Sequence, residues 1–313
     1  MPGVVAITGA TGFIGTHVVR QLADRGWMVR ILTRRIPGSH LFPLPRVEAV
    51  IGDLADPGAL ERLVAGTDAV VHLAGVVKAP SAEAFHQANV VGTRAIAEAV
   101  AALPKGRLIH ISSLAAREPA LSDYAHSKTE AENEIRRISN GIDWIIIRPS
   151  VVYGPGDRET LGFFQAAERG FSVIPGPRDQ RISFINVRDL SNLINVLVEN
   201  NATGETLEID DSKPGGYGWP EIIGAMSTAT GKRLLSLHLP ATVVRMVAGI
   251  NAAVHRLGGS TTMFTPGKAR ELLHRDWAAR APAAGTLSGW TPAHRLAEGF
   301  EKTMLWYRAA GWL

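Results

Sequence analysis

A tyrosine and a lysine four residues apart are the side chains of this chain best suited to proton transfer. Tyr124 and Lys128 fall in a segment with helical periodicity, Tyr124–Arg137, so both lie on one face of the expected helix. A free tyrosine has a pKa of about 10. An ammonium about 4 Å from the phenolate, at an effective dielectric constant of about 20, stabilises it by roughly 4 kcal/mol. This would lower the phenol pKa by about three units, which suits proton exchange with a carbonyl or an alcohol. Taken alone, the same spacing is more typical of a surface helix pair.

Two serines follow an apolar segment, Leu108–Ile111, that is typical of a strand. Open parallel sheets bind their ligands at the carboxyl ends of the strands, which is where Ser112 and Ser113 would lie. A hydroxyl group at Ser113 can orient the substrate oxygen that Tyr124 protonates. The alternative is an ordinary turn or helix-cap serine.

A glycine-rich turn near the N-terminus is typical of a dinucleotide-binding site. Thr8-Gly-Ala-Thr-Gly-Phe-Ile-Gly15 follows an apolar strand, Val4–Ile7, and leads into a helical pattern, Phe13–Arg25. The first glycine permits a tight turn, the second lets the backbone approach the phosphates, and the third lets the helix pack on the strand. The N-terminus of that helix then faces the anion. The expected cofactor contacts in this turn are Gly9, Thr11, Gly12, Phe13, Ile14 and Gly15.

The first half of the chain alternates strand-like and helix-like segments. Strands are predicted at Val4–Ile7, Met28–Leu32, Val47–Ile51, Ala69–Leu73, Leu108–Ile111 and Trp144–Ile147. Helices are predicted at Phe13–Arg25, Pro57–Val64, Ala82–Ala102 and Tyr124–Arg137. Continuous apolar strands between helices predict an α/β fold, a Rossmann-type doubly wound parallel sheet.

The pattern changes after Gly154-Pro-Gly156. A helix at Leu161–Glu168 is followed by strands at Ser183–Val187 and Thr206–Ile209, which we expect to return to the sheet, and the chain looks helical from Trp219 onward. Residues 1–155 with about 182–212 are therefore predicted to form the NAD(P)-binding Rossmann domain. Residues of about 156–181 with 213–313 would form a smaller, mostly helical C-terminal substrate lobe.

The composition fits an ordinary globular protein. The 313 residues are 46% hydrophobic and 20% charged, with a net charge of +4. The absence of cysteine excludes disulfides, thiolate metal sites and a cysteine nucleophile. The ten histidines are scattered, so no metal site is expected. The chain shows no basic run with aromatics, no apolar stretch long enough for a membrane span and no secretory signal. We therefore expect a cytoplasmic protein that binds a small-molecule substrate, with no nucleic acid and no membrane span.

Five motifs in order resemble those of the short-chain dehydrogenase/reductase family. The resemblance is to its extended branch, the NAD-dependent epimerase/dehydratase-like proteins, which includes sugar-nucleotide epimerases. The motifs are Thr8–Gly15, Gly52-Asp53-Leu54, His72-Leu-Ala-Gly75, the set Ser113, Tyr124 and Lys128, and Arg148–Pro155; Gly289–Pro292 also looks like that branch's C-terminal end.

The resemblance implies a role for each matched residue. Hydride would move between a nicotinamide and a carbinol carbon while Tyr124 passes the proton, Lys128 tunes it and Ser113 holds the oxygen. Asp53 would accept a hydrogen bond from the adenine amine, and Lys128 would also bind the nicotinamide ribose. Further cofactor contacts are implied at Leu54, Leu73, Ala74, Gly75, Pro149 and Val152, and substrate contacts at Lys78, Ser113 and Arg181.

The end of the second predicted strand bears on the choice of cofactor. A carboxylate at this point would favour NAD, but the segment runs Ile31-Leu-Thr-Arg-Arg35. Arg34 or Arg35 can pair with a 2′-phosphate through charge-assisted hydrogen bonds. This favours NADP, with NAD as the alternative if the two arginines are merely solvated.

The substrate motifs depart from those of the sugar-nucleotide enzymes. The asparagine that such epimerases carry shortly after Arg148 is missing, as are their Tyr-Gly after the serine strand and the acidic pair of the dehydratases. Arg181 does match a position that family members use to bind diphosphate, unless it forms only a surface salt bridge.

The segment Pro240–Gly258 contains an apolar stripe at helical spacing. Its members are Val243, Val244, Val247, Ile250 and Val254. The stripe is explained by packing within the lobe, by a homodimer face, or by a lid over an apolar pocket like that of the steroid-type and flavonol-type reductases of the same branch.

We therefore expect an NAD(P)-dependent oxidoreductase that interconverts a ketone and a secondary alcohol. The first alternative is a nucleotide-sugar epimerase. An alternative of another class is a non-catalytic cofactor-binding scaffold or redox sensor.

Overall fold

The structure of the chain is a computed structural model. It describes residues 3–36, 38, 45–139, 141–200, 203–257, 264–280 and 289–313. The chain divides into two compact units, Met1–Arg148 with Ser191–Leu207, and Pro149–Leu190 with Glu208–Leu313. The assignment of one unit to the cofactor and the other to the substrate stays a prediction.

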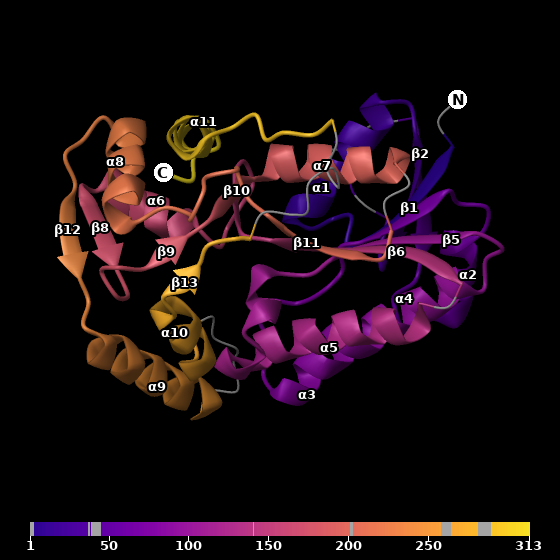
Figure 1. Cartoon of the computed structure of the whole chain (residues 1–313), viewed down its shortest axis with the longest axis horizontal. Coiled ribbons are helices and arrows are strands. Elements are labelled where there is room, and N and C mark those ends of the chain that lie inside the picture. Colours follow the sequence, from indigo (N-terminus) through magenta and orange to yellow (C-terminus); the bar gives the residue numbers. More distant parts are fainter. Residues whose placement is uncertain are drawn as a thin grey trace. The chain divides into compact units, whose positions relative to one another are not determined.

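A seven-stranded sheet forms the centre of the first unit (Figure 1). Its order is β3 (Val47–Ile51), β2 (Met28–Thr33), β1 (Val4–Thr8), β4 (Ala69–His72), β5 (Gly106–Ile111), β6 (Ile142–Pro149) and β11 (Glu205–Ile209). The pairings recorded from β3 through β6 are all parallel. The order turns back at β1 and β4, as in doubly wound nucleotide-binding folds, and the predicted fold class is confirmed.

Helices cover both faces of this sheet. Figure 1 shows α2 (Pro57–Val64), α4 (Gly92–Ala101) and α5 (Asp123–Ile138) on one side and α1 (Phe13–Asp24) on the other. Helix α7 (Val187–Glu199), which the sequence patterns did not predict, joins α1 through a 3.0 Å hydrogen bond from Asn195 Nδ2 to Gln21 Oε1. Because both faces are covered, the central strands β1 and β4 are apolar up to their last residues, Thr8 and His72.

The helix predicted at Ala82–Ala102 is interrupted. It consists of α3 (Ala82–Phe85), a π-helical segment (His86–Val91) and α4. Wider π-type turns often mark functional positions. Here the turn carries Asn89, which is 1% exposed.

The second unit contains short strand pairs as well as helices. The strand pairs are β7 (Val151–Tyr153) with β10 (Phe184–Asn186), β8 (Phe171–Ile174) with β12 (Leu235–His238), and β9 (Arg181–Ile182) with β13 (Asp276–Trp277). The helices are α6 (Leu161–Glu168), α8 (Trp219–Thr230), α9 (Ala241–Leu257), α10 (Pro266–Leu273) and α11 (Leu296–Ala309). An aromatic cluster of Tyr153, Phe164, Phe300 and Tyr307 fills the core of this unit.

Two expectations about this unit were wrong in detail. The strand predicted at Ser183–Val187 does not return to the central sheet, because Phe184 packs into the aromatic cluster and its strand pairs with β7. The region after Trp219 is not wholly helical, since β12 and β13 lie within it. Gly258, the last residue of the segment Pro240–Gly258, lies outside the described residues.

Candidate active site

The glycine turn joins β1 to α1 as the sequence predicts. Gly9 has a positive φ of 72°, and a methyl group built on it would lie 2.6 Å from the backbone nitrogen of Ala74. A methyl group on Gly15 would overlap the carbonyl oxygen of Gly9. Gly12 caps α1 without a side-chain acceptor, so the N–H groups of the first turn can serve an anion.

Lys128 lies at the carboxyl ends of β4 and β5. It is 6% exposed, and its Nζ donates a 2.9 Å hydrogen bond to the carbonyl oxygen of Ile111, the last residue of β5. A methyl group on Gly75, just beyond β4, would lie 3.7 Å from the same nitrogen. Burial lowers the pKa of Lys128 to about 8, while the carboxylate of Glu132 opposes that change. The ammonium therefore keeps its proton at neutral pH and faces the strand end where a ligand is expected.

Tyr124 lies one turn before Lys128 on α5. Ser122 begins the helix, since its Oγ accepts a 2.9 Å hydrogen bond from the N–H of Ala125. The Tyr124 ring is half-buried beside Phe85, with 6.1 Å between ring centroids. The phenol and the ammonium therefore belong to one helix with a well-defined start.

The two serines after β5 have different surroundings. Ser112 is buried, and its Oγ donates a 2.7 Å hydrogen bond to Glu132 Oε1. Ser113 is half-buried, and its Oγ accepts a 3.2 Å hydrogen bond from the N–H of Ala115, which makes it a cap of the following turn. A capping hydroxyl still carries a proton to donate, so the cap and the substrate-orienting role are compatible.

A buried carboxylate beside this group was not found from the sequence. Glu132 follows Lys128 by one turn of α5, and its side chain is fully buried. It accepts two hydrogen bonds from Arg148, at 2.8 and 2.7 Å, and one from Arg136 at 2.9 Å. Burial alone would raise the pKa of Glu132, but hydrogen bonds from Arg148, Ser112 and Arg136 hold it below its usual value. The sequence signal was its i, i+4 relation to Lys128 on the helix face that also carries Ala131 and Ile135.

Two buried histidines lie under the strand ends. His72 contacts Thr8 Oγ1 at 2.6 Å and Thr93 Oγ1 at 3.0 Å, and its ring stacks on His110 with 5.2 Å between centroids. Burial, aided by the positive charge of Lys128, lowers the pKa of His72 to about 3 and that of His110 well below its usual value. Both rings are therefore neutral at pH 7.

Asn89 acts as a structural hydrogen-bonding residue. Its side chain accepts a 2.8 Å hydrogen bond from the N–H of Val76 and donates 3.1 Å and 2.9 Å bonds to Val76 O and Ser127 Oγ. Ser127 in turn donates to the carbonyl oxygen of Tyr124 at 2.8 Å. Asn89 thus ties the loop after β4 to the start of α5.

The predicted adenosine-side residues lie at the ends of β2 and β3. Arg34 and Arg35 follow β2 and are exposed, with Thr33 Oγ1 donating a 2.7 Å bond to the Arg35 carbonyl oxygen. Asp53 follows β3, is exposed, and accepts a 2.9 Å hydrogen bond from the N–H of Ala55. Leu54 packs toward α4, where a methyl group on Gly92 would meet its side chain. Residues 37 and 39–44, which come after the arginines, lie outside the described part of the chain.

The remaining predicted residues are distributed over both units. Leu73 and Ala74 are half-buried after β4, and Lys78 is exposed in the loop that follows. Pro149 is buried at the end of β6. In the second unit, Val152 lies on β7, opposite Ile185 of β10.

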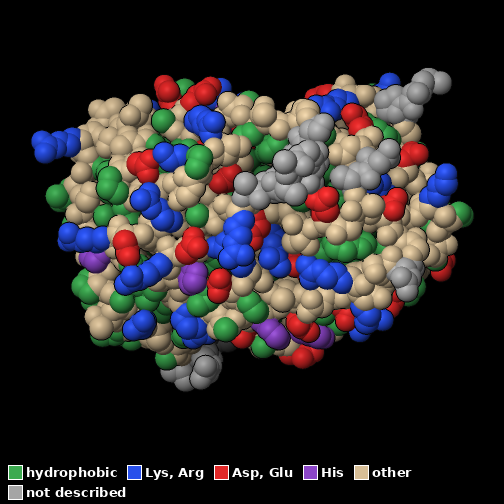
Figure 2. Space-filling view, viewed as in Figure 1, with side chains coloured by type: hydrophobic (Ala, Val, Ile, Leu, Met, Phe, Trp, Pro, Cys, Tyr) green, Lys and Arg blue, Asp and Glu red, His purple; other side chains and the backbone are tan. Residues whose placement is uncertain are grey.

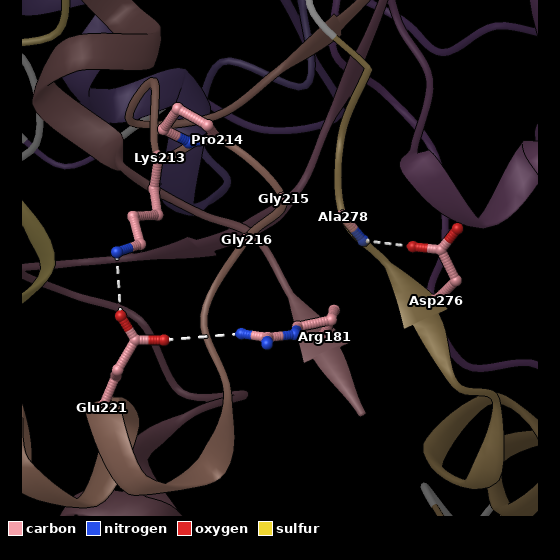
Figure 3. Close-up of a pocket in the computed structure, with 8 residues that line it drawn as sticks. All are labelled: Arg181, Lys213, Pro214, Gly215, Gly216, Glu221, Asp276 and Ala278. Atoms are coloured by element: carbon pink, nitrogen blue, oxygen red, sulfur yellow. Dashed lines mark hydrogen bonds and ion pairs between the residues drawn. The ribbon is translucent and has the colours of Figure 1, made fainter. Parts of the chain in front are cut away.

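Arg181 lines an open cavity of about 580 Å³ within the second unit (Figure 3). Figure 3 shows Arg181 and Lys213 pointing toward the same carboxylate, Glu221, at 3.6 and 2.8 Å. Gly215 and Gly216 form another part of the wall of this cavity. The partner of Arg181 is therefore Glu221, while Asp189 instead accepts hydrogen bonds from His294.

The described residues contain neither a metal-binding cluster nor a membrane-spanning helix. No group of three or more histidine, aspartate or glutamate side chains is arranged to hold a metal ion within that part of the chain. None of the described helices has the length and hydrophobicity of a membrane span.

The sequence of the chain is similar to a family of known enzymes. The sequence profile of the NAD dependent epimerase/dehydratase family matches residues 5–210. The chain is 41% identical to a ceramide reductase of Caulobacter vibrioides, over 99% of this chain and 96% of that protein. It is 30% identical to a 2-alkyl-3-oxoalkanoate reductase of Stenotrophomonas maltophilia, over 67% of this chain and 66% of that protein.

Solved structures share the fold. UDP-glucuronic acid 4-epimerase of Bacillus cereus, solved with UDP-glucuronic acid and NAD, superposes with a TM-score of 0.74 at 20% identity, covering 98% of this chain and 99% of that one. MoeE5, solved with UDP-glucuronic acid and NAD, gives a TM-score of 0.73 at 22% identity, over 99% and 100% of the two chains.

Proposed function

Because the chain belongs to the NAD-dependent epimerase/dehydratase family, we propose that it is an NAD(P)-dependent oxidoreductase interconverting a ketone and a secondary alcohol. Tyr124 is the proton donor and acceptor in this proposal, Lys128 sets its acidity, and Ser113 holds the substrate oxygen. The observation that carries the proposal is the position of Lys128, a buried ammonium between the ends of β4 and β5 and one helical turn from Tyr124.

The chain's own residues supply the proton chemistry. The bound nicotinamide supplies or accepts the hydride at the carbinol carbon. During reduction, the Tyr124 hydroxyl gives its proton to the oxygen that becomes the alcohol, and the negative charge left on the phenolate is stabilised by the Lys128 ammonium. The Ser113 hydroxyl donates a hydrogen bond to the same oxygen and so fixes the carbonyl in place.

The glycine turn and the strand ends would hold the cofactor. The N–H groups of the first turn of α1 would hold the pyrophosphate, and the close fit of Gly9 against Ala74 supports the tight turn that this needs. We propose a preference for NADP, since Arg34 and Arg35 are exposed directly after β2, where an NAD enzyme would carry a carboxylate.

We propose a long-chain lipid ketone as the substrate. A ceramide reductase resembles this chain over nearly its whole length, and a second relative is named for a ketone on an alkyl chain. A ceramide has a secondary alcohol at carbon 3, so the ketone that fits the proposed chemistry is the 3-oxo form of such an N-acylated amino alcohol.

A nucleotide sugar is the second candidate, and the cavity at Arg181 is the observation that favours it. Arg181 and Lys213 bring two cations to one wall, as binding of a diphosphate requires. Their pairing with Glu221 weakens this candidate, because an anion would have to displace or repel that carboxylate.

The test is turnover with a defined pair of substrates. The purified protein is incubated either with NADPH and a 3-oxo ceramide in mixed micelles or with NADP⁺ and UDP-glucose, and NADPH oxidation and the product of each reaction are measured. We expect NADPH oxidation and alcohol formation with the lipid only. Epimerised UDP-sugar without lipid turnover would support the second candidate, and no turnover of either substrate by a protein that binds NADPH would support a scaffold or sensor.

A further inference from the structure

Helix α9 exposes an apolar face that the described residues of the second unit do not cover. Val244 and Ala248 face inward and pack with Ala269 of α10. The opposite side of the helix carries large apolar side chains in water, with exposed fractions of 58% for Met246 and 58% for Ile250. Val247 and Val254 belong to the same face and are 46% and 60% exposed. Packing within the unit thus explains why Val244 is apolar, but it does not explain the exposed apolar side chains of the stripe.

The exposed apolar side chains of the molecule are concentrated in this region. Of the thirteen large apolar side chains recorded as exposed in the described part of the chain, six lie in β12 and α9. The two in β12, Leu235 and Leu237, alternate along the strand and so lie on one face of it. Scattered exposed apolar side chains are normal, but a continuous patch marks an interaction surface.

The charged residues of the segment that contains β12 and α9 are all basic. Residues 222–270 contain no aspartate or glutamate, but they contain Lys232, Arg233, Arg245, Arg256, Lys268 and Arg270. Arg245 is exposed, and helical geometry places it between the packed face and the apolar face of α9. Elsewhere on the face shown in Figure 2, both basic and acidic side chains are present. Lys232 and Lys268 pair with Glu168 and Glu271, which lie outside this segment, so among the described side chains the exposed cation beside the apolar face of α9 is Arg245.

An apolar face with basic residues beside it favours one of the two surfaces that could cover α9, an anionic membrane, over a second copy of the chain. A second copy of the chain joined about a two-fold axis would bring the same cationic segment against itself, and like charges oppose that contact. A bilayer with anionic headgroups offers negative charge at its surface and hydrocarbon beneath it. Apolar residues on one side of a helix and Lys or Arg beside them are the pattern of helices that lie in such an interface.

We propose that α9 is an interfacial membrane-docking helix that places Met246, Val247, Ile250 and Val254 in an anionic lipid surface. The helix lies on the bilayer and does not span it. The proposal does not depend on the reaction catalysed, although a protein that reduces a lipid ketone would meet its substrate at such a surface.

The test is binding to vesicles of two compositions. Wild-type protein is sedimented with phosphatidylcholine vesicles with and without phosphatidylglycerol. We expect binding to the anionic vesicles at least tenfold stronger than to the neutral ones and weakened by added salt. The double substitution Met246→Ser with Ile250→Ser should lower the anionic-vesicle partition coefficient at least tenfold. The matched control Leu305→Ser, which removes a side chain 56% exposed on α11, should leave it unchanged.

A second variant separates charge from apolar contact. Arg245→Glu retains the apolar face and should lower binding to anionic vesicles with no change in melting temperature. Reduction of a short water-soluble ketone should be the same in all these variants, so a failure of the proposed reaction is distinguishable from a failure of docking. Equal partitioning of wild type and the double variant would overturn the proposal. A dimer that the double variant abolishes, with no vesicle binding by wild type, would assign the face to a second copy instead.

Discussion

The guanidinium of Arg148 meets the carboxylate of Glu132 through two hydrogen bonds, from Nε to Oε1 at 2.8 Å and from a terminal nitrogen to Oε2 at 2.7 Å. Glu132 is fully buried on α5, and Arg148 lies near the end of β6. The pair fixes the helix that carries Tyr124 and Lys128 to the strand ends of the sheet. Ser112 adds a third link from β5 to the same carboxylate.

Breaking this pair should destabilise the fold. Glu132→Ala leaves the Arg148 guanidinium without its carboxylate in a largely buried site, and such losses cost about 3–5 kcal/mol of unfolding free energy. Urea denaturation followed by circular dichroism measures the change. Arg137→Ala is the control, since its pair with Glu134 is exposed and should contribute less than about 1 kcal/mol. Equal losses of unfolding free energy in both variants would show that the buried pair contributes no more to stability than an exposed one.

The stability of the protein should fall as the solution becomes more acidic. His72 has a folded-state pKa of about 3 against an ordinary value of 6.5, because burial disfavours its charged form. Below pH 6.5 the unfolded chain therefore binds more protons than the folded chain. The contribution of His72 to the free energy of unfolding is fully present above that pH and decreases as the solution is acidified. For His72 alone, the loss between pH 7 and pH 5 should be about 2 kcal/mol.

His110→Phe separates the contribution of the second histidine. Both ring nitrogens of His110 are buried without a hydrogen-bond partner in the described part of the chain, so the substitution removes no bond that the structure records. We expect a melting temperature at pH 7 no lower than that of wild type, and a smaller decrease between pH 7 and pH 5. A decrease identical to that of wild type would mean that His110 is not held neutral by the fold.

Cofactor preference should depend on the arginines after β2. The double substitution Arg34→Ala with Arg35→Ala should raise the Kd for NADPH about 10- to 100-fold, the cost of one charge-assisted hydrogen bond or two, while changing the Kd for NADH less than about twofold. Fluorescence titration measures both constants. Arg20→Ala, an exposed arginine on α1, serves as the control. An unchanged ratio of the two constants would remove these residues from the site.

Activity should decline at alkaline pH because of Lys128. Its pKa of about 8 is low for a lysine, since burial outweighs the attraction of Glu132. As the pH rises through this value, the ammonium loses its proton and stops stabilising the Tyr124 phenolate. The rate of ketone reduction at saturating cofactor should therefore fall above a pH of about 8, whereas Lys128→Met should be slow at every pH. A wild-type rate that stays constant well above that pH would exclude this role.

The sequence predicted the sheet and the glycine turn well because local patterns determine them. The strand before Gly9, the helix after Gly12 and the Asp56-Pro57 start of α2 are all specified by neighbouring residues, and the Asp56 side chain does accept a hydrogen bond from the N–H of Ala59. For Glu132 the local pattern gives only its i, i+4 relation to Lys128 on one helix face, which does not reveal that the carboxylate is buried. The stretch Lys128-Thr-Glu-Ala-Glu132 resembles an exposed charged helix, and its burial arises from Arg148, sixteen residues away.

Other short strands of the second unit were missed for a similar reason, since β13, with the two residues Asp276 and Trp277, is too short for an alternating pattern. The strand at Phe184–Asn186 was predicted within Ser183–Val187, but its pairing with β7 was not, because packing in the aromatic cluster decides it. The apolar stripe of α9 was recognised, but its periodicity alone does not say which of its side chains are buried. Only the tertiary structure shows that Val244 packs inward and that Ile250 lies in water.

The central claim, that Tyr124 exchanges the proton with the substrate oxygen, is tested most directly with Tyr124→Phe. The measurement compares kcat for reduction of a 3-oxo ceramide, and the Kd for NADPH, between this variant and wild type. The account predicts a kcat lower by about 10²- to 10⁴-fold, with the Kd within about threefold of wild type. A variant that reduces the ketone at the wild-type rate would contradict it.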